Sequence, residues 1–195
     1  ALFANTTGTQ NTAVGANALE DNTTGFGNTS IGYQSLSNNT TGITNTALGV
    51  GVLTNNTTGI ANTAIGAQAL TANIVGTGNM AIGTLTLTSN ISGNSNTAIG
   101  YNSLYHNTTG DVNIGIGDRS LEFRNGSGNI AIGINAGSKS SSPVNAVSNN
   151  IFIGANAGYN ATGNNNVFIG NDVGTGITLS NTLAIDNSNT VTPLI

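Results

Sequence analysis

The chain has 195 residues, enough for one domain, and only 5% of them are charged, against roughly a quarter in an ordinary soluble domain. A net charge of −4 leaves no basic surface for nucleic acid and no Lys/Arg-rich face for a membrane surface. Cysteine is missing, which excludes disulfides and thiolate metal sites, and no apolar run approaches the ~18 residues of a membrane span.

One pentapeptide, Asn-Thr-Ala-Ile-Gly with variants, recurs along the chain. Its first Asn falls every 17 residues without slippage, at Asn11, Asn28, Asn45, Asn62, Asn79, Asn96 and Asn113. Later copies begin at Asn129, Asn150 and Asn166, and a last variant begins at Asn181. A strict period indicates stacked repeats that each contact their neighbours, and 17 residues suit one coil of a β-roll rather than a helix pair.

We number each repeat from this Asn as position 1. Position 4 is a branched aliphatic residue and position 5 is Gly in the first ten repeats, position 9 is Leu in the first seven, and positions 12 and 15 are Asn and Gly in the first six. Leu2, Asn5 and Gly8 fit the same columns one period earlier, which indicates that Ala1 lies inside a repeat. The structural columns are represented by Ile31, Gly32, Leu36, Asn39, Gly42, Ile65, Gly66, Leu70, Ile99, Gly100 and Leu104.

Taken in chain order, each repeat predicts two short strands and a turn. The first strand is Thr-Ala-Ile-Gly, beginning at residues 12–15, with the position 4 side chain pointing into a narrow core. The second surrounds Ala-Leu-Thr, as at 69–71, and Asn-Thr-Thr-Gly then forms a turn in which stacked Asn side chains can build an amide ladder. Helix is disfavoured by Gly, Asn and Thr.

These elements predict an all-β fold, a repetitive parallel β-roll or β-helix solenoid with 17-residue coils, over residues 1–180. The period breaks at 138–148, which should protrude as a loop. Residues 181–195 are expected to form a terminal coil or a connector to a missing domain.

The small residues at position 3 suggest a second buried surface. Each coil offers about one Ile and one Leu to an interior, which is little against the backbone entropy lost on folding. Small side chains would let another chain approach closely, so we expect a parallel homotrimer around one axis. Position 3 is occupied by Ala13, Ser30, Ala47, Ala64, Ala81, Ala98, Gly115 and Ala131, and then by Phe152 and Phe168, where the cross-section should widen with both rings in the core.

The repeats of residues 11–170 resemble the head repeats of trimeric autotransporter adhesins (the YadA-like head). The resemblance implies a left-handed parallel β-roll that trimerises, although the period of 17 is longer than usual and the Asn-Thr-Thr-Gly loop is unusually uniform. The tail 181–195 is similar to the segment that precedes a C-terminal chaperone domain in phage tail-fibre-like proteins. Together they imply an extracellular fibre, on a cell surface or virion, that attaches to a glycan or protein receptor.

No catalytic, cofactor or metal site is predicted. His106, the only histidine, is expected in an exposed loop, and a bound ion at Asp172 or Asp186 on a trimer axis stays open. Arg119, Glu122 and Arg124 are expected to form a surface charge cluster where the register changes. The candidate ligand contacts are Tyr33, Tyr101, Tyr105, Lys139 and Arg119, although the tyrosines could equally pack at coil edges instead of stacking on sugars.

The leading hypothesis is a structural and adhesive, non-enzymatic fibre segment. The first alternative is an ice-binding solenoid, in which Thr pairs such as Thr23/Thr24 and Thr40/Thr41 form a flat array, although that array breaks at residues 74–75 and 91–92. The second is a glycan-cleaving fibre domain, which would need paired carboxylates in a groove that the scattered acids do not supply within one chain.

Overall fold

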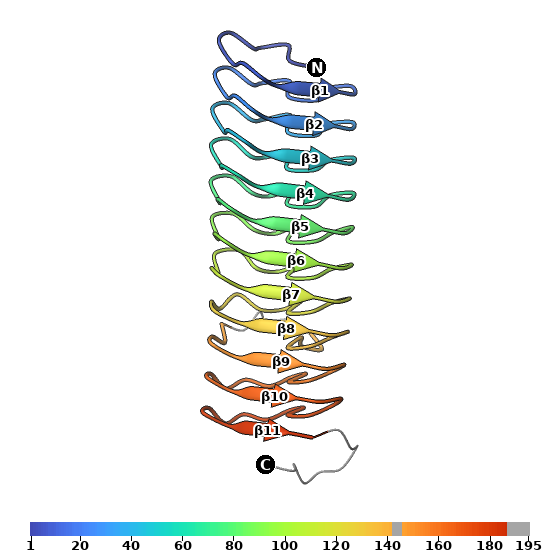
Figure 1. Cartoon of the computed structure of the whole chain (residues 1–195), viewed down its shortest axis with the longest axis vertical. Helices are drawn as coiled ribbons and strands as arrows, with labels where there is room; N and C mark the ends of the chain where they lie inside the picture. Colours follow the sequence, from blue (N-terminus) through green and yellow to red (C-terminus); the bar gives the residue numbers. More distant parts are fainter. Residues whose placement is uncertain (142–145, 187–195) are drawn as a thin grey trace.

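The protein is a single parallel β-solenoid. The computed structural model describes residues 1–141 and 146–186, in which eleven three-residue strands form one sheet in sequence order (Figure 1). Consecutive strands pair in parallel in the register of the repeat, for example Ala47 with Ala64. The strands are β1 Thr12–Val14, β2 Thr29–Ile31, β3 Thr46–Leu48, β4 Thr63–Ile65, β5 Met80–Ile82, β6 Thr97–Ile99, β7 Ile114–Ile116, β8 Ile130–Ile132, β9 Ile151–Ile153, β10 Val167–Ile169 and β11 Leu183–Ile185. The predicted all-β parallel solenoid is therefore confirmed.

Each coil contains one strand, so the prediction of a second strand around Ala-Leu-Thr is wrong. That segment is a turn in which the position 9 leucines adopt positive φ angles of 49° to 53°. Position 7 also has a positive φ, as at Gln34 and Asn102. Two left-handed residues so close together reverse the chain tightly, and the returning run of positions 8 to 12 covers the inner side of the sheet (Figure 1).

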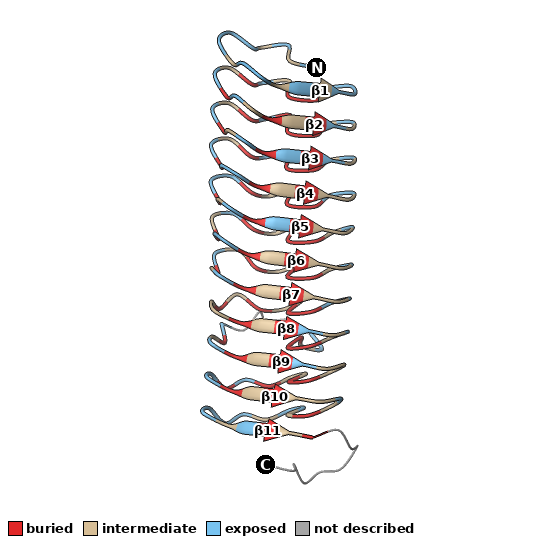
Figure 2. Cartoon of the chain, in the orientation of Figure 1, coloured by how far each residue is buried: buried red, intermediate tan, exposed pale blue. Residues whose placement is uncertain are grey.

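The strand side chains point in the directions opposite to those predicted. The position 3 residues are buried, as at Ala47 and Ala64, and pack with the position 9 leucines in the core. The position 4 residues point outward and are half-buried or exposed (Figure 2). The interior is too narrow for a branched side chain: even at Gly115 an added Cβ would lie 2.7 Å from Ser103 Oγ. The small column is thus part of this chain's own core and does not contact a partner.

Two columns of buried asparagine stack along the solenoid and confirm the expected amide ladder: the position 1 column continues to Asn166, whereas the position 12 column ends at Asn107. At position 12, Asn56 Nδ2 donates to Asn39 Oδ1 at 2.8 Å and to Gly59 O at 3.2 Å. At position 1, Asn62 Nδ2 donates to Asn45 Oδ1 at 3.1 Å and to Gly76 O at 2.8 Å. These bonds satisfy buried polar groups in every coil and tie each coil to its neighbours.

The core changes composition near the C-terminal end. Phe152 and Phe168 replace the position 3 alanines and are fully buried, as predicted, with ring centroids 5.8 Å apart. In the same coils, position 9 changes from Leu to Gly158 and Gly174, and each glycine lies against a phenylalanine ring. In these two coils the large side chain comes from position 3 and the small residue is at position 9, which is the reverse of the arrangement in the earlier coils.

The 138–148 insertion joins β8 to β9, and its ends are packed, since Ser138 and Val147 are buried. Residues 142–145 of this predicted loop lie outside the described residues. Within the segment 181–195, β11 continues the sheet beside β10, whereas residues 187–195 of the predicted connector also lie outside the described residues.

Candidate functional site

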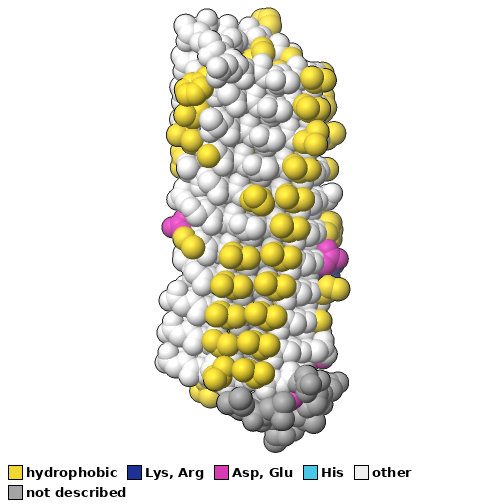
Figure 3. Space-filling view, in the orientation of Figure 1, with side chains coloured by type: hydrophobic (Ala, Val, Ile, Leu, Met, Phe, Trp, Pro, Cys, Tyr) yellow, Lys and Arg dark blue, Asp and Glu magenta, His cyan; other side chains and the backbone are white. Residues whose placement is uncertain are grey.

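The outer side of the sheet is an apolar surface that no part of the described chain covers. We call positions 2 and 4 of β1 to β10, together with Leu183 and Ile185 at the matching places of β11, the outward sheet face. Position 4 is aliphatic in every strand, with 57% of Val14, 44% of Leu48 and 40% of Ile132 exposed. Figure 3 shows these side chains as a column that follows the sheet along the long axis of the molecule. Monomeric proteins rarely expose a continuous apolar surface of this extent, so the face is a candidate interface.

The outward sheet face becomes wider toward the C-terminal end. Position 2 is Thr in β1 to β4 and in β6, with Met80 in β5 between them. From β7 onward it is Ile114, Ile130, Ile151, Val167 and Leu183, so two apolar columns run side by side in the lower half of Figure 3.

A second feature lies on the returning run, in the coils of β6 and β7. Tyr105 and His106 occupy positions 10 and 11 of one coil, and Glu122 and Phe123 occupy the same positions of the next. The His106 ring meets Tyr105 edge to face at 4.6 Å and stacks on Phe123 at 4.5 Å, with an angle of 26° between the stacked rings. All three rings are partly exposed, and they form a short aromatic ledge.

Polar side chains adjoin this ledge. Asn102 Nδ2 donates to Glu122 Oε1 at 3.3 Å, and Arg119 Nε lies 4.0 Å from Glu122 Oε2. The amide oxygen of Asn102 is buried and makes no hydrogen bond. The Arg119 backbone N–H donates to Tyr101 O at 2.8 Å, which brings Tyr101 to the edge of the group. We call Asn102, Tyr105, His106, Arg119, Glu122 and Phe123 the aromatic–charged cluster.

Burial changes the acid–base behaviour of the cluster. Partial burial raises the pKa of Glu122, and the opposing effects of the Arg119 charge and the Asn102 hydrogen bond do not cancel it. Partial burial also lowers the pKa of His106, so its ring is neutral at pH 7. The ionised form of Glu122 is therefore disfavoured by its surroundings, and Arg119, with Nε 4.0 Å from Glu122 Oε2, is the cation that opposes this effect.

The structure brings together three of the five predicted ligand contacts, since Tyr101, Tyr105 and Arg119 lie in or beside the cluster. Lys139 is at position 11 one coil beyond Phe123. Tyr33 lies four repeats away from Tyr101 at the same position 6 and takes no part. Sequence reasoning assigned His106 no role and did not select Phe123 or Asn102, although the 17-residue spacing of His106 and Phe123 would have revealed their stacking.

Arg124 corrects the expectation of a surface charge cluster, because it is only 1% exposed. It replaces the position 12 asparagine, and its Nε donates to Gly137 O at 2.5 Å while Nη2 donates to Ser138 O at 3.2 Å. Burial lowers the pKa of Arg124 to about 10, so the guanidinium stays charged at neutral pH. It supports the start of the insertion and is not available to an external ligand.

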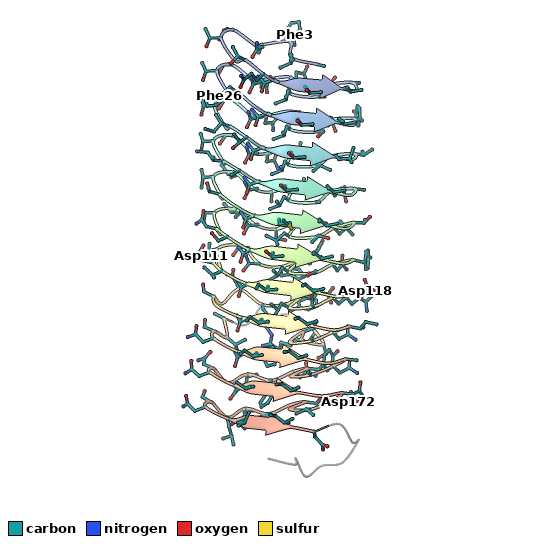
Figure 4. All side chains as sticks on the ribbon, in the orientation of Figure 1. Phe3, Phe26, Asp111, Asp118 and Asp172 are labelled. Atoms are coloured by element: carbon teal, nitrogen blue, oxygen red, sulfur yellow. The ribbon has the colours of Figure 1, made fainter. Side chains whose placement is uncertain are left out.

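The other candidate residues are dispersed. Asp172 lies at the turn after β10, at the edge of the sheet (Figure 4), where it accepts a hydrogen bond from Asn156 Nδ2 at 2.8 Å. Asp186 is buried directly after β11. In the Thr pairs, Thr23 and Thr40 direct their hydroxyls to carbonyls of the following coil, at 2.9 and 3.0 Å. Those hydroxyls are already engaged within the solenoid.

Within residues 1–141 and 146–186 there is no group of three or more His, Cys, Asp or Glu side chains placed to hold a metal ion. The same part of the chain contains no helix long and apolar enough to cross a membrane. No protein-family model, curated protein or solved structure matches this chain.

Proposed function

We propose that the chain is a structural and adhesive, non-enzymatic segment of an extracellular fibre, on a cell surface or virion, and that it assembles as a parallel homotrimer through the outward sheet face. The observation that carries the proposal is the unbroken column of aliphatic side chains, half-buried or exposed, that runs along the outward sheet face at position 4 from β1 to β10 and at Ile185 of β11. Water contact with this column is unfavourable in a lone chain, and burial between copies removes it.

The outward sheet face suits an assembly in which parallel copies of the chain share one axis that runs along the solenoid. Each coil repeats the same geometry at ~4.8 Å intervals, so parallel copies place equivalent coils at the same level and every coil contributes to the contact. Eleven strands give a rod section roughly 50 Å long. The resemblance to trimeric adhesin heads sets the expected number of copies at three. The wider apolar band over β7 to β11 makes that half the stronger part of the contact.

Light scattering after size exclusion tests the assembly. We expect a mass near three times the monomer mass of 19.4 kDa. Ile132→Lys would place three cations in the buried contact and should reduce the mass to that of the monomer. The matched control is Ile134→Lys, two residues later in the same coil, which is 58% exposed at the turn beyond the sheet and should leave the trimer intact.

A folded monomer of the unaltered chain would refute the trimer, and a mass near twice 19.4 kDa would replace it with a dimer. Equal dissociation by Ile132→Lys and Ile134→Lys would show that the outward sheet face is not the contact. Circular dichroism on each variant separates loss of assembly from loss of the fold.

A further inference from the structure

We infer that the aromatic–charged cluster is a binding site for a neutral glycan. It is an exception in a chain of which only 5% of residues are charged, because an ion pair, the single histidine and two further aromatic rings gather within two coils. No other coil of the described chain carries a stacked ring pair of this kind at its surface. The inference deepens the proposed attachment role and rests on it for its biological meaning.

The contacts of the cluster match the two sides of a sugar ring. A pyranose presents a C–H face that packs on aromatic rings, and the partly exposed ledge of Tyr105, His106 and Phe123 offers such a platform. Its vicinal hydroxyls pair with planar polar groups, and Glu122 and Arg119 supply an acceptor and a donor next to the ledge. The ligand therefore needs both an apolar and a hydroxyl-rich surface, which sugars combine.

Two features indicate a purpose beyond stability. The side chain of Glu122 is only 14% exposed beside Arg119, and burial raises the pKa of its carboxyl group, so the folded state disfavours its ionised form. Asn102 holds Glu122 with its amide nitrogen while its amide oxygen stays buried without a hydrogen bond. Unfavourable groups of this kind concentrate at functional sites.

The charge balance selects the class of glycan. Arg119 is offset by Glu122 and by Asp118, whose charge also acts on Glu122, and burial favours the neutral form of His106. The cluster thus offers no excess positive charge for a sialic or uronic acid, and a neutral oligosaccharide fits better.

The cluster also stays accessible in the proposed fibre. Its aromatic rings and Glu122 lie on the returning run, which covers the inner side of the sheet, and Asn102 and Arg119 lie in the turns before it, whereas assembly uses the outer side. A parallel trimer would display three copies of the cluster at one level, which raises the avidity for a glycan-covered surface.

The test is an array of neutral and sialylated oligosaccharides probed with the full chain, followed by calorimetric titration of the strongest neutral ligand. We expect binding to neutral glycans. Glu122→Gln and Tyr105→Ala should each weaken it by about tenfold or more, as expected when a ligand hydroxyl loses its charged acceptor or a ring loses its stacking partner.

Two controls match these changes in kind, and the first also matches in repeat position. Glu20→Gln alters a glutamate at position 10 of the first full coil, and Tyr33→Ala removes an exposed tyrosine outside the cluster. Both should leave the affinity unchanged.

Absence of binding, binding to sialylated glycans alone, or equal losses in the cluster and control variants would overturn the inference. Light scattering on the same samples keeps the two proposals apart. A trimer that binds no glycan refutes the glycan site and leaves the proposed assembly standing. A monomer that binds glycan through Glu122 refutes the assembly and supports the glycan site.

Discussion

Single side chains in this solenoid belong to columns, so the effect of a substitution depends on the neighbours above and below it. Asn56 donates to Asn39 and accepts from Asn73, each at 2.8 Å, and all three are fully buried. Removing one rung therefore leaves Asn39 Oδ1 without its donor and takes one of two acceptors from Asn73 Nδ2, which still donates to Gly76 O. Asn5, at the end of the same column, is exposed and can replace a lost bond with water.

Asn56→Ala is accordingly expected to lower the free energy of unfolding by about 3 kcal/mol, because several buried donors and acceptors lose their partners. Asn5→Ala should cost about 1 kcal/mol or less. Urea denaturation of the two variants beside the unaltered chain measures the difference. Equal costs would show that the ladder contributes nothing beyond local turn bonding.

A second prediction concerns the coils in which Phe at position 3 and Gly at position 9 replace the Ala and Leu of the earlier coils. Phe152→Ala should cost about 3–5 kcal/mol through the cavity it leaves. Gly158→Leu alone should also destabilise, because the Gly158 position lies against the Phe152 ring. The double variant restores the Ala-plus-Leu pair of the earlier coils, where Leu already adopts the same positive φ, as at Leu104.

We therefore expect the double variant to be more stable than Phe152→Ala by at least about 1 kcal/mol in urea denaturation. If the decreases in the free energy of unfolding of the two single variants simply add in the double variant, positions 152 and 158 do not share one space in the core.

Glu122 gives a prediction about pH. Its pKa is raised in the folded state, so the ionised form is disfavoured on folding, and its contribution to stability is favourable below the unfolded pKa and is lost as pH rises through the folded pKa. Glu122→Gln should thus raise the melting temperature at pH 7 and leave it nearly unchanged at pH 4. Thermal melts at both pH values check this, and a variant that is less stable at pH 7 would show that the ion pair with Arg119 outweighs burial.

At the scale of the element, each strand is only three residues long, and β1 to β10 are each followed by a glycine that the stacking requires. Gly66, directly after β4, has φ +121°, and a Cβ there would lie 2.6 Å from Gly83 O in the next coil. The glycine column therefore permits both the turn and the close approach of successive coils. Gly176 has a positive φ of 71° but nothing within 4 Å of the added carbon.

This contrast separates backbone strain from steric overlap. Gly66→Ala should destabilise by more than about 3 kcal/mol, since it combines a disfavoured φ with a collision against backbone. Gly176→Ala should cost about 1 kcal/mol, from φ alone. Melting temperatures of the two variants decide the matter, and similar values would mean that neighbouring coils can move apart.

At the scale of the whole molecule, stability and assembly are coupled if the outward sheet face is buried between copies. The melting temperature should then rise with protein concentration, because the trimer is favoured by mass action. Scanning calorimetry over a hundredfold range of concentration measures this, and Ile132→Lys should abolish the dependence. A melting temperature that does not change with concentration in the unaltered chain would contradict coupled assembly.

The amino-acid sequence by itself determined the period, the parallel stacking, the register and the asparagine and glycine columns, because a 17-residue spacing leaves one way to align successive coils. It did not determine which side of the strand is inside. Hydrophobicity favoured Ile at position 4 as the buried residue. The interior lies between the strand and the returning run, however, and it admits only small residues opposite Leu, so its width depends on both segments together.

The aromatic–charged cluster also depended on the tertiary structure. Its members belong to different coils and turns, so Asn102 and Glu122 become neighbours only when the positive-φ turns fold the returning run against the next coil.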